Sequence, residues 1–213
     1  GVIYAHDVSA FEKAKLRLLN APHSTLAYVG CLLGYETVFD AMQDKVLTQF
    51  IQQMIGDELM PSFTPPTELG VQQYSNDILA RFRNPAIRHL LAQIAWDGSQ
   101  KLPMRVLPAI RDNLAAGKPV DKLAFAIAAW CRFIVKRYKD NEKLVDPLAE
   151  PLLAVAAQCT GQADTDVALF LAVDAVFPAE LSLNKTFFPA VRAAYQQLAT
   201  GPAAALAVFA GEA

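Results

Sequence analysis

The sequence predicts an all-α protein that folds as a single compact multi-helix domain. Apolar residues recur at helical spacing along most of the chain, and apart from a candidate short strand at residues 2–4 the alternation typical of strands is missing. Proline and glycine breakers separate the helical stretches at short intervals, and none of them lies in a long linker. At 213 residues, the chain is long enough to bury a sizeable core.

The individual helices follow from this periodicity in chain order. Val46, Phe50 and Leu59 belong to the first clear helical face, which Asp44 is placed to cap and Pro61 to stop. The same pattern predicts further helices over residues 69–82, 86–96, 103–116, 121–138, 148–160, 164–176 and 185–199. Residues 123–131 are apolar at every position, so we expect this helix to be covered on most sides and to form the centre of the core.

Composition excludes several classes of function. With 54% hydrophobic and 19% charged residues, the chain is not of the disordered type. Lysine and arginine total 19 against 21 aspartates and glutamates, a formal net charge of −2, so nucleic acid and acidic membrane surfaces are poor partners. The longest uncharged stretches, 18–35 and 193–211, contain polar residues together with proline and glycine, so neither is expected to span a bilayer.

The termini and cysteines suggest where the protein works. Residues 2–5 are too short for the apolar region of a secretory signal, and Cys31, Cys131 and Cys159 are too widely spaced for a disulfide framework or a zinc site. We therefore expect a cytoplasmic protein. Because the chain begins at Gly1 without an initiator methionine, we also expect it to be a piece of a longer protein.

Two common kinds of cofactor site are absent from the sequence. There is no glycine-rich dinucleotide fingerprint and no phosphate-binding P-loop, so a bound nucleotide would need another domain. The three histidines, His6, His23 and His89, lack metal-ligand spacing and flanking cysteine pairs, so no metal is expected.

The most suggestive segment is 11–24, where Lys15, Asn20 and His23 lie close together in sequence beside Pro22. Proline lacks an N–H and clashes with the carbonyl four residues before it, so the helix should kink or restart near residues 20–21. A restart could aim the three polar side chains at one cavity.

A structural reading of the same residues stands beside this one. Lys15 would be a solvated helix lysine, Asn20 the cap of the next helix and His23 a residue of its first turn. Ser9 and Glu12 fit a capping box, which alone would explain Glu12.

Two motifs in the same order resemble those of the polyol-specific long-chain dehydrogenases, the family that includes mannitol 2-dehydrogenase and fructuronate reductase. The first is Lys15 followed by Asn20 and His23 in the pattern Lys-x-x-x-x-Asn-x-x-His. The second is Arg-Phe-Arg-Asn-Pro-Ala-Ile-Arg-His at 81–89, followed by Gln-Ile-Ala-Trp-Asp-Gly-Ser-Gln-Lys-Leu-Pro at 93–103. The resemblance covers residues 1–213 as the helical C-terminal substrate domain of a two-domain dehydrogenase, whose N-terminal Rossmann domain is absent from this chain.

The resemblance implies roles for the first motif. Lys15 would be the general acid/base for the reacting oxygen, Asn20 and His23 would hydrogen-bond that oxygen, and Glu12 would relay the proton to solvent. Hydride exchange between a secondary alcohol and nicotinamide develops alkoxide character, which such donors stabilise. NAD would be bound mainly by the absent domain, and no metal is implied. Pro22 departs from the small residue expected there, which leaves the backbone path between Asn20 and His23 open.

The second motif implies substrate-binding residues. Lys101, Arg105 and Arg88 are candidates to bind the remote hydroxyls or the carboxylate of an open-chain sugar, since each offers several donors. In the alternative interpretation these three side chains are solvated at the surface and bind no substrate. Only Lys101 is favoured as a substrate-binding residue by the motif itself.

The expected function is an NAD-dependent oxidoreductase acting on an open-chain polyol or sugar acid. The stretch at 93–105 resembles the sugar-acid members of the family, and Arg105 would pair with a carboxylate, so fructuronate and mannonate are favoured, with mannitol 2-dehydrogenase activity as the alternative. The expected partners are a small sugar or sugar acid and the Rossmann domain, and the resemblance favours a monomer. In the alternative of another class, the chain is a non-catalytic helical binding or assembly module whose polar residues are only caps.

Overall fold

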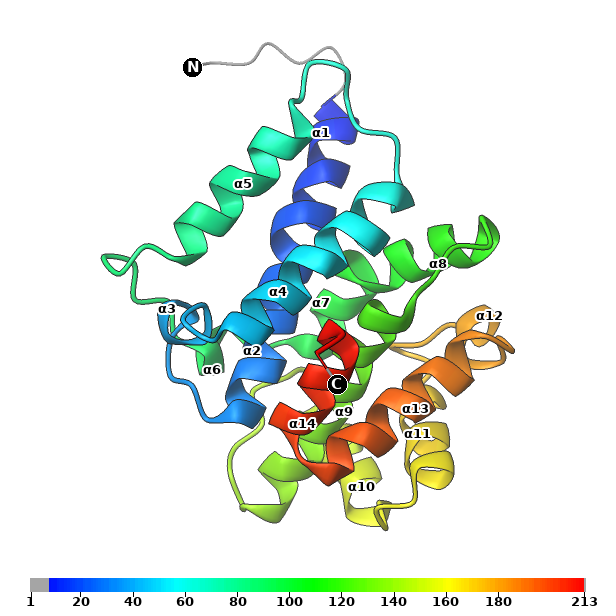
Figure 1. Cartoon of the computed structure of the whole chain (residues 1–213). Helices are drawn as coiled ribbons and strands as arrows, with labels where there is room; N and C mark the ends of the chain where they lie inside the picture. The colour runs from blue at the N-terminus through cyan, green and yellow to red at the C-terminus, as the bar shows by residue number, and fades with distance from the viewer. Residues whose placement is uncertain (1–7, 213) are drawn as a thin grey trace.

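The computed structural model describes residues 8–212, and within them the fold is all-α, as the sequence predicts (Figure 1). The first half contains α1 (Val8–Lys15), the π-helical segment η1 (Leu16–Asn20), α2 (Ala21–Leu33), α3 (Val38–Ala41), α4 (Lys45–Gln53), the π-helical segment η2 (Met54–Leu59), the 3₁₀ turn η3 (Met60–Ser62), α5 (Val71–Phe82), α6 (Leu91–Ile94), α7 (Gly98–Arg105) and α8 (Leu107–Ala115). The second half contains α9 (Asp121–Lys139), α10 (Ala149–Gln158), α11 (Ala163–Leu171), α12 (Ala179–Ser182), α13 (Phe187–Thr200) and α14 (Pro202–Ala210). The candidate strand at residues 2–4 lies outside the described part.

The longest helix, α9, is the centre of the core. Every side chain from Leu123 to Cys131 is buried, as expected from the unbroken apolar run. Helices α13 and α2 pack on α9, while α14 packs against α13 and α4 (Figure 1). Complete burial on several sides explains why this segment carries no polar face.

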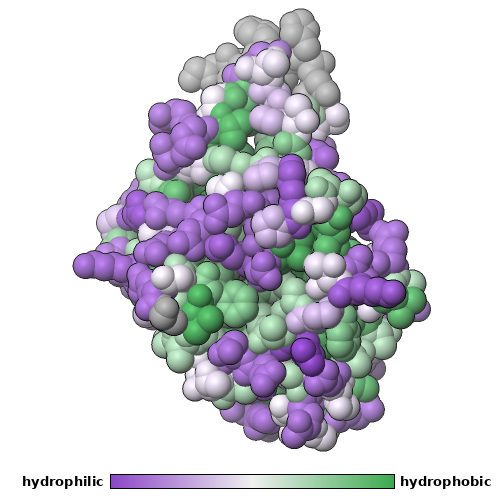
Figure 2. Space-filling view, turned by 45° about the vertical axis from the view of Figure 1, so that its right-hand side comes forward, coloured by the Kyte–Doolittle hydropathy of each residue, from purple (hydrophilic) through white to green (hydrophobic). Residues whose placement is uncertain are grey.

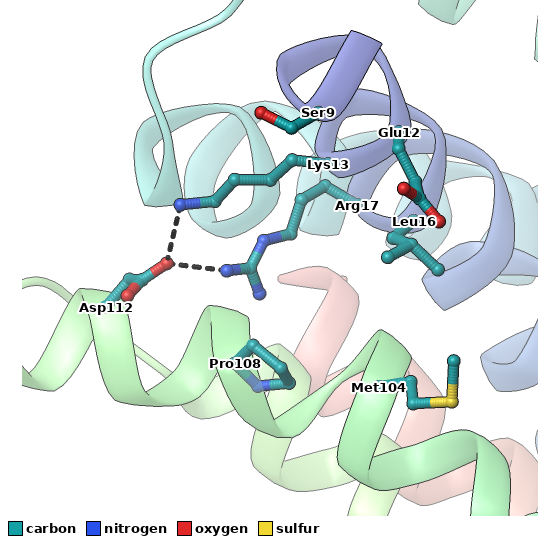
Figure 3. A pocket seen from close by; sticks show the side chains of 8 residues that line it. All are labelled: Ser9, Glu12, Lys13, Leu16, Arg17, Met104, Pro108 and Asp112. Carbon is teal, nitrogen blue, oxygen red and sulfur yellow. Dashed lines mark hydrogen bonds and ion pairs between the residues drawn. The ribbon is translucent and has the colours of Figure 1, made fainter.

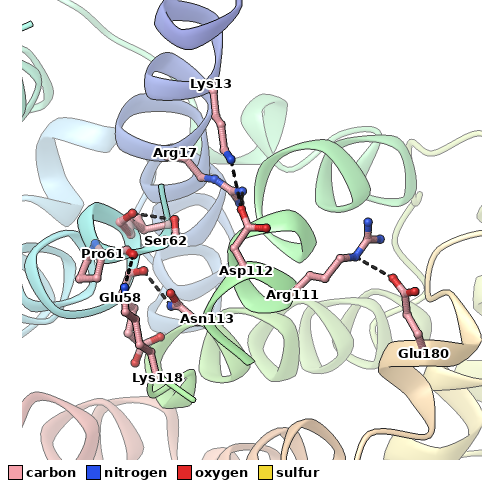
Figure 4. A network of polar contacts seen from close by, with 11 residues as sticks. Lys13, Arg17, Glu58, Pro61, Ser62, Arg111, Asp112, Asn113, Lys118 and Glu180 are labelled. Carbon is pink, nitrogen blue, oxygen red and sulfur yellow. Dashed lines mark hydrogen bonds and ion pairs between the residues drawn. The ribbon is translucent and has the colours of Figure 1, made fainter. Parts of the chain in front are cut away.

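A buried carboxylate fixes the beginning of α9. Glu58 is 1% exposed and accepts hydrogen bonds from the backbone N–H groups of Lys122 (2.7 Å) and Leu123 (2.8 Å). These N–H groups have no partner within the helix, and a negative charge is favourable at a helix N-terminus. Burial raises the pKa of Glu58, and the two backbone bonds oppose that rise. Asn113 of α8 links to the same segment by donating from its side-chain amide to the backbone carbonyl of Glu58 at 2.8 Å (Figure 4).

The predicted interruption near residues 20–21 is present, but as a widened turn rather than as a break. The backbone stays helical through Asn20 and Ala21, and the Ala21 N–H donates to the carbonyl of Leu16, five residues before it. A π turn relieves the clash between the Pro22 ring and the carbonyl of Leu18 that an α-helix would impose. Helices α1 and α2 are therefore continuous through η1.

An ion pair anchors η1 to α8. Arg17 is 3% exposed, and its guanidinium lies 2.5 Å from the carboxylate of Asp112, which also pairs with Lys13 at 3.4 Å (Figure 4). Burial lowers the pKa of Arg17, and Asp112 opposes that change. The pair fixes the helical segment that separates Lys15 from His23.

Several predicted boundaries are wrong, for identifiable reasons. Most of the helix predicted over 86–96 is absent, because residues before α6 pair instead with the strand-like segment at Thr37: Val38 N–H donates to the carbonyl of His89, and Leu91 N–H to that of Glu36. The helix predicted over 103–116 is two helices, since Pro108 cannot donate to the preceding turn. Helix α11 ends at Leu171 rather than near residue 176.

The capping predictions have mixed outcomes. Asp44 caps α4 by accepting from the N–H groups of Val46 (2.9 Å) and Leu47 (3.1 Å), as predicted. Helix α1 already includes Val8, so Ser9 lies within its first turn, and the capping box predicted for Ser9 and Glu12 is wrong.

On the face shown in Figure 2, bands of hydrophilic residues alternate with apolar areas. Within residues 8–212, large apolar side chains that remain exposed are Val8, Trp96, Met104, Tyr138, Leu183 and Val208. None of the helices in this range is long and apolar enough to cross a membrane. The three cysteines are free thiols.

Candidate active site

His23 is the centre of the candidate site. It lies in the first turn of α2, stacks on Phe82 of α5 with ring centroids 5.3 Å apart, and meets His89 edge-on at 5.8 Å. Its Nε2 is buried and has no hydrogen-bond partner among the described residues. Burial, together with the smaller effects of the charges of His89, Arg105 and Lys101, lowers the pKa of His23 to about 4. His23 is therefore neutral near pH 7 and free to share a hydrogen bond with a ligand.

Asn20 ends the π segment, three residues before His23. Its Oδ1 is also buried and lacks a partner within residues 8–212. Buried polar atoms are normally satisfied, so two orphaned atoms this close in one helix indicate a position that a polar ligand can fill. The helix does not use the Asn20 side chain as a cap, so the structure removes the alternative explanation of this residue.

Two cations of α7 lie beside His23. Lys101 donates from Nζ to the carbonyl of Ile94 at 3.0 Å, and Arg105 donates from Nη1 to Ser24 Oγ, next to His23, at 3.0 Å. Both side chains are partly buried, which lowers the pKa of each. The structure thus places Lys101 and Arg105 near the first motif, although about eighty residues separate them in sequence. Their positive charges suit an anionic group or an oxygen that gains negative charge.

The structure does not bring Arg88 into this cluster. Its guanidinium lies 3.7 Å from Glu36, and both side chains are about three-quarters exposed (75% and 70%). Such an exposed ion pair contributes little to the stability of the fold. No contact links Arg88 to the cluster in the described part of the chain. Instead, its neighbour His89 joins His23.

Lys15 and Glu12 are exposed on the helix that precedes Asn20. Lys15 ends α1, and within the described range it has no ion pair or hydrogen bond to hold its amine. Glu12 lines an open groove of about 340 Å³ between α1 and the α7–α8 pair, together with Leu16, Met104 and Pro108 (Figure 3). No bond joins Glu12 to Lys15 in residues 8–212, so its role as a relay remains a proposal.

Sequence reasoning missed four neighbours of the cluster: Ser24, Tyr28, Phe82 and His89. Phe82 and His89 lie inside the second motif and Ser24 directly follows the first, but none of the three carried an assigned role. Tyr28 fits the apolar periodicity and gave no separate signal. The Tyr28 hydroxyl is buried without a partner among the described residues, and burial raises its pKa, so it stays protonated.

The described residues contain no group of three or more side chains suited to hold a metal ion. They also include no glycine-rich loop at a helix N-terminus that could bind a pyrophosphate.

Comparison with known proteins identifies the family. Residues 7–199 match the model of the mannitol dehydrogenase C-terminal domain. The chain belongs to this family. The resemblance that the two sequence motifs carry is thereby confirmed, as is the assignment to a helical C-terminal domain.

The relatives of this mannitol dehydrogenase domain are oxidoreductases. It is 38% identical over 200 residues to D-mannonate oxidoreductase of Escherichia coli, and the match covers 93% of this chain and 41% of that protein. It is 32% identical over 196 residues to mannitol 2-dehydrogenase of Aspergillus oryzae, which covers 91% of this chain and 38% of that protein.

A solved structure has the same fold. Mannitol 2-dehydrogenase of Pseudomonas fluorescens, in a ternary complex with NAD and D-mannitol, superposes with a TM-score of 0.89 and 26% identity; the match covers all of this chain and 43% of that one. The chain thus spans less than half the length of these relatives.

Proposed function

We propose that this chain is the substrate-binding and catalytic domain of an NAD-dependent oxidoreductase that interconverts a secondary alcohol and a ketone in an open-chain polyol or sugar acid. The observation that carries the proposal is the cluster of His23, Lys101 and Arg105 beside the orphaned Asn20 Oδ1. Family membership supports the same chemistry. A preceding Rossmann domain would hold most of the NAD, which supplies the hydride acceptor.

In this proposal Lys15, Asn20 and His23 act on the reacting oxygen. Asn20 donates from its amide nitrogen Nδ2, and neutral His23 from one ring nitrogen, to that oxygen as negative charge develops on it, while the unpaired Asn20 Oδ1 can accept from a substrate hydroxyl. Lys15 accepts the alcohol proton during oxidation and returns it during ketone reduction. Its exposed amine lets the proton leave to solvent, with Glu12 as the proposed relay.

We favour a sugar acid, fructuronate or mannonate, over a neutral polyol. Arg105 lies near His23 and is anchored by one bond to Ser24, which leaves further guanidinium donors for a carboxylate. Lys101 adds a second positive charge to the same place. The identity to D-mannonate oxidoreductase supports this preference, whereas the likeness to mannitol 2-dehydrogenases keeps mannitol as the alternative.

The test uses the full-length protein and its Arg105→Met variant, with mannonate and mannitol as substrates. We expect mannonate to be preferred, and the variant to lose roughly a hundredfold in kcat/KM for mannonate, because a charge-assisted bond is worth about 3 kcal/mol. The loss for mannitol should be much smaller. Arg88→Met, which removes an exposed arginine, is the matched control and should change neither value.

A preference for mannitol that Arg105→Met leaves intact would favour the alternative substrate. Absence of activity on every polyol and sugar acid in the folded full-length protein would favour the non-catalytic module.

A further inference from the structure

The helix that carries Lys101 and Arg105 is fixed at its start by parts of the chain far from it in sequence. Helix α7 begins at Gly98, after Asp97, whose φ of 56° is in the left-handed region. A Cβ on Gly98 would lie 2.3 Å from Trp130 Nε1 and 2.8 Å from the Tyr28 hydroxyl. The first turn of α7 is therefore pressed directly against side chains of α9 and α2.

Asp146, in the loop between α9 and α10, also holds this turn in place. Its Oδ2 accepts from the Ser99 N–H at 2.9 Å, and its Oδ1 accepts from the Ser99 hydroxyl at 2.5 Å. Oδ1 also accepts from the Leu148 N–H at 2.8 Å, before α10. The adjacent carbonyl of Val145 accepts from the Asp97 N–H at 2.9 Å. One carboxylate therefore joins the starts of two helices.

Asp146 also acts on Lys101 through its charge. Lys101 is surrounded by Asp97 and Arg105 near the ends of α7, by Asp146 from the loop and by His23 from α2. Burial and Arg105 lower the pKa of Lys101, whereas Asp97 and Asp146 raise it. Removing the Asp146 charge would therefore let Lys101 lose its proton at lower pH.

We propose that Asp146 is a positioning residue for substrate binding: it holds the first turn of α7 so that Lys101 and Arg105 face the position beside His23, and it balances their charge. The inference rests on the proposed function, which assigns Lys101 and Arg105 to the substrate. Asp146 itself bonds to the backbone and to Ser99, not to a reacting atom.

The test is Asp146→Asn in the full-length enzyme. Asparagine has nearly the same shape, but its amide nitrogen cannot accept from the Ser99 N–H, and its charge is lost. We expect KM for the sugar acid to rise about tenfold while kcat changes much less. The alkaline limb of the KM profile, which reports loss of the Lys101 proton, should move to lower pH. Unchanged KM and an unmoved limb would overturn the proposal.

Two further variants separate positioning from charge and from general destabilisation. Ser99→Ala keeps the Asp146 charge and loses the 2.5 Å bond, so KM should rise without a shift of the alkaline limb. If Asp146→Asn does not fold, an unchanged KM in Ser99→Ala overturns the proposal. Asp140→Asn removes an exposed carboxylate that pairs with Lys136 at the end of α9, and it should leave KM and the limb as in wild type.

A direct titration of the Lys101 side chain by NMR keeps this inference separate from the proposed function. A titration midpoint of Lys101 that is lower in folded Asp146→Asn than in wild type supports the charge interaction between Asp146 and Lys101, and an equal midpoint overturns it. Either result holds even if the wild-type protein oxidises no polyol or sugar acid. That last result would overturn the proposed function alone.

Discussion

At the scale of single residues, the candidate site is defined by polar atoms that the fold leaves without partners. Asn20 Oδ1 and His23 Nε2 are buried within one continuous helical stretch and have no partner among residues 8–212. Leaving a buried polar group unpaired costs about 1–3 kcal/mol. A hydrogen-bonding ligand would recover this energy, which ties the two positions to function rather than to stability.

Lys15 gives the sharpest test of the proposed chemistry. In the full-length enzyme, Lys15→Ala should lower kcat by roughly 10²- to 10⁴-fold, because a group that transfers a proton in the transition state is lost. The pH-dependent limb of alcohol oxidation that this base produces should disappear, and the free energy of unfolding should barely change. The measurement is a pH profile of kcat, with exposed Lys185→Ala as the control. Near-normal turnover with the limb retained would remove Lys15 from the mechanism.

His23 predicts a dependence of stability on pH. Its pKa is lowered to about 4 in the folded chain, mainly by burial, against about 6.5 when unfolded. Between these values the unfolded chain binds the extra proton, so the folded state loses stability as the pH falls through this window. The shift corresponds to about 3 kcal/mol.

Urea unfolding of the chain and of its His23→Gln variant measures this effect. The wild-type free energy of unfolding, relative to the variant, should fall by about 3 kcal/mol between about pH 7 and about pH 4. Parallel profiles of the two proteins would show that His23 is not held neutral by its surroundings.

At the scale of secondary-structure elements, the local sequence pattern predicted helices correctly where contacts with distant parts of the chain do not change the backbone conformation. The apolar run at 123–131 and the Asp44 cap are local signals, and both predictions are confirmed. The residues before α6 pair with the segment around Thr37, which is far away in sequence, so their helical periodicity gave a wrong prediction. Likewise, the clustering of Lys101 with His23 was found through a family motif, whereas the Asp146 contact with Ser99 depends on chain packing that no spacing encodes.

The tight packing of the first turn of α7 against Trp130 and Tyr28 can be tested by adding a single methyl group at Gly98. Gly98→Ala would place its Cβ against Trp130 Nε1 in a fully buried position, so we expect a loss of about 1–3 kcal/mol in the free energy of unfolding. Gly56→Ala is a matched control within η2, because no atom lies within 4 Å of the added Cβ. That variant should be neutral or gain up to about 1 kcal/mol. Equal effects in urea unfolding would contradict the tight packing at Gly98.

At the scale of the whole molecule, the described residues share one hydrophobic core around α9, yet their polar cluster would supply only part of the proposed dehydrogenase. In the proposed function Lys101, Arg105 and His23 bind and polarise a sugar, but hydride transfer needs a second reactant in register with that sugar. The chain spans 43% of the mannitol 2-dehydrogenase of Pseudomonas fluorescens, which is bound to both NAD and D-mannitol. Substrate recognition and nucleotide binding are therefore proposed to reside mainly in different parts of the full protein.

This division predicts that the 213-residue chain alone does not bind NADH tightly. Its sequence contains no glycine-rich loop that opens a helix after a strand, the arrangement that binds a pyrophosphate through backbone N–H groups. Fluorescence titration or calorimetry should show no saturable binding below about 1 mM, while the full-length protein binds NADH and reduces its substrate. Alone, the chain should also show no dehydrogenase activity. Tight saturable binding to the chain would require a nucleotide site among its own residues, and the assignment of His23, Lys101 and Arg105 to the sugar would then have to be re-examined first.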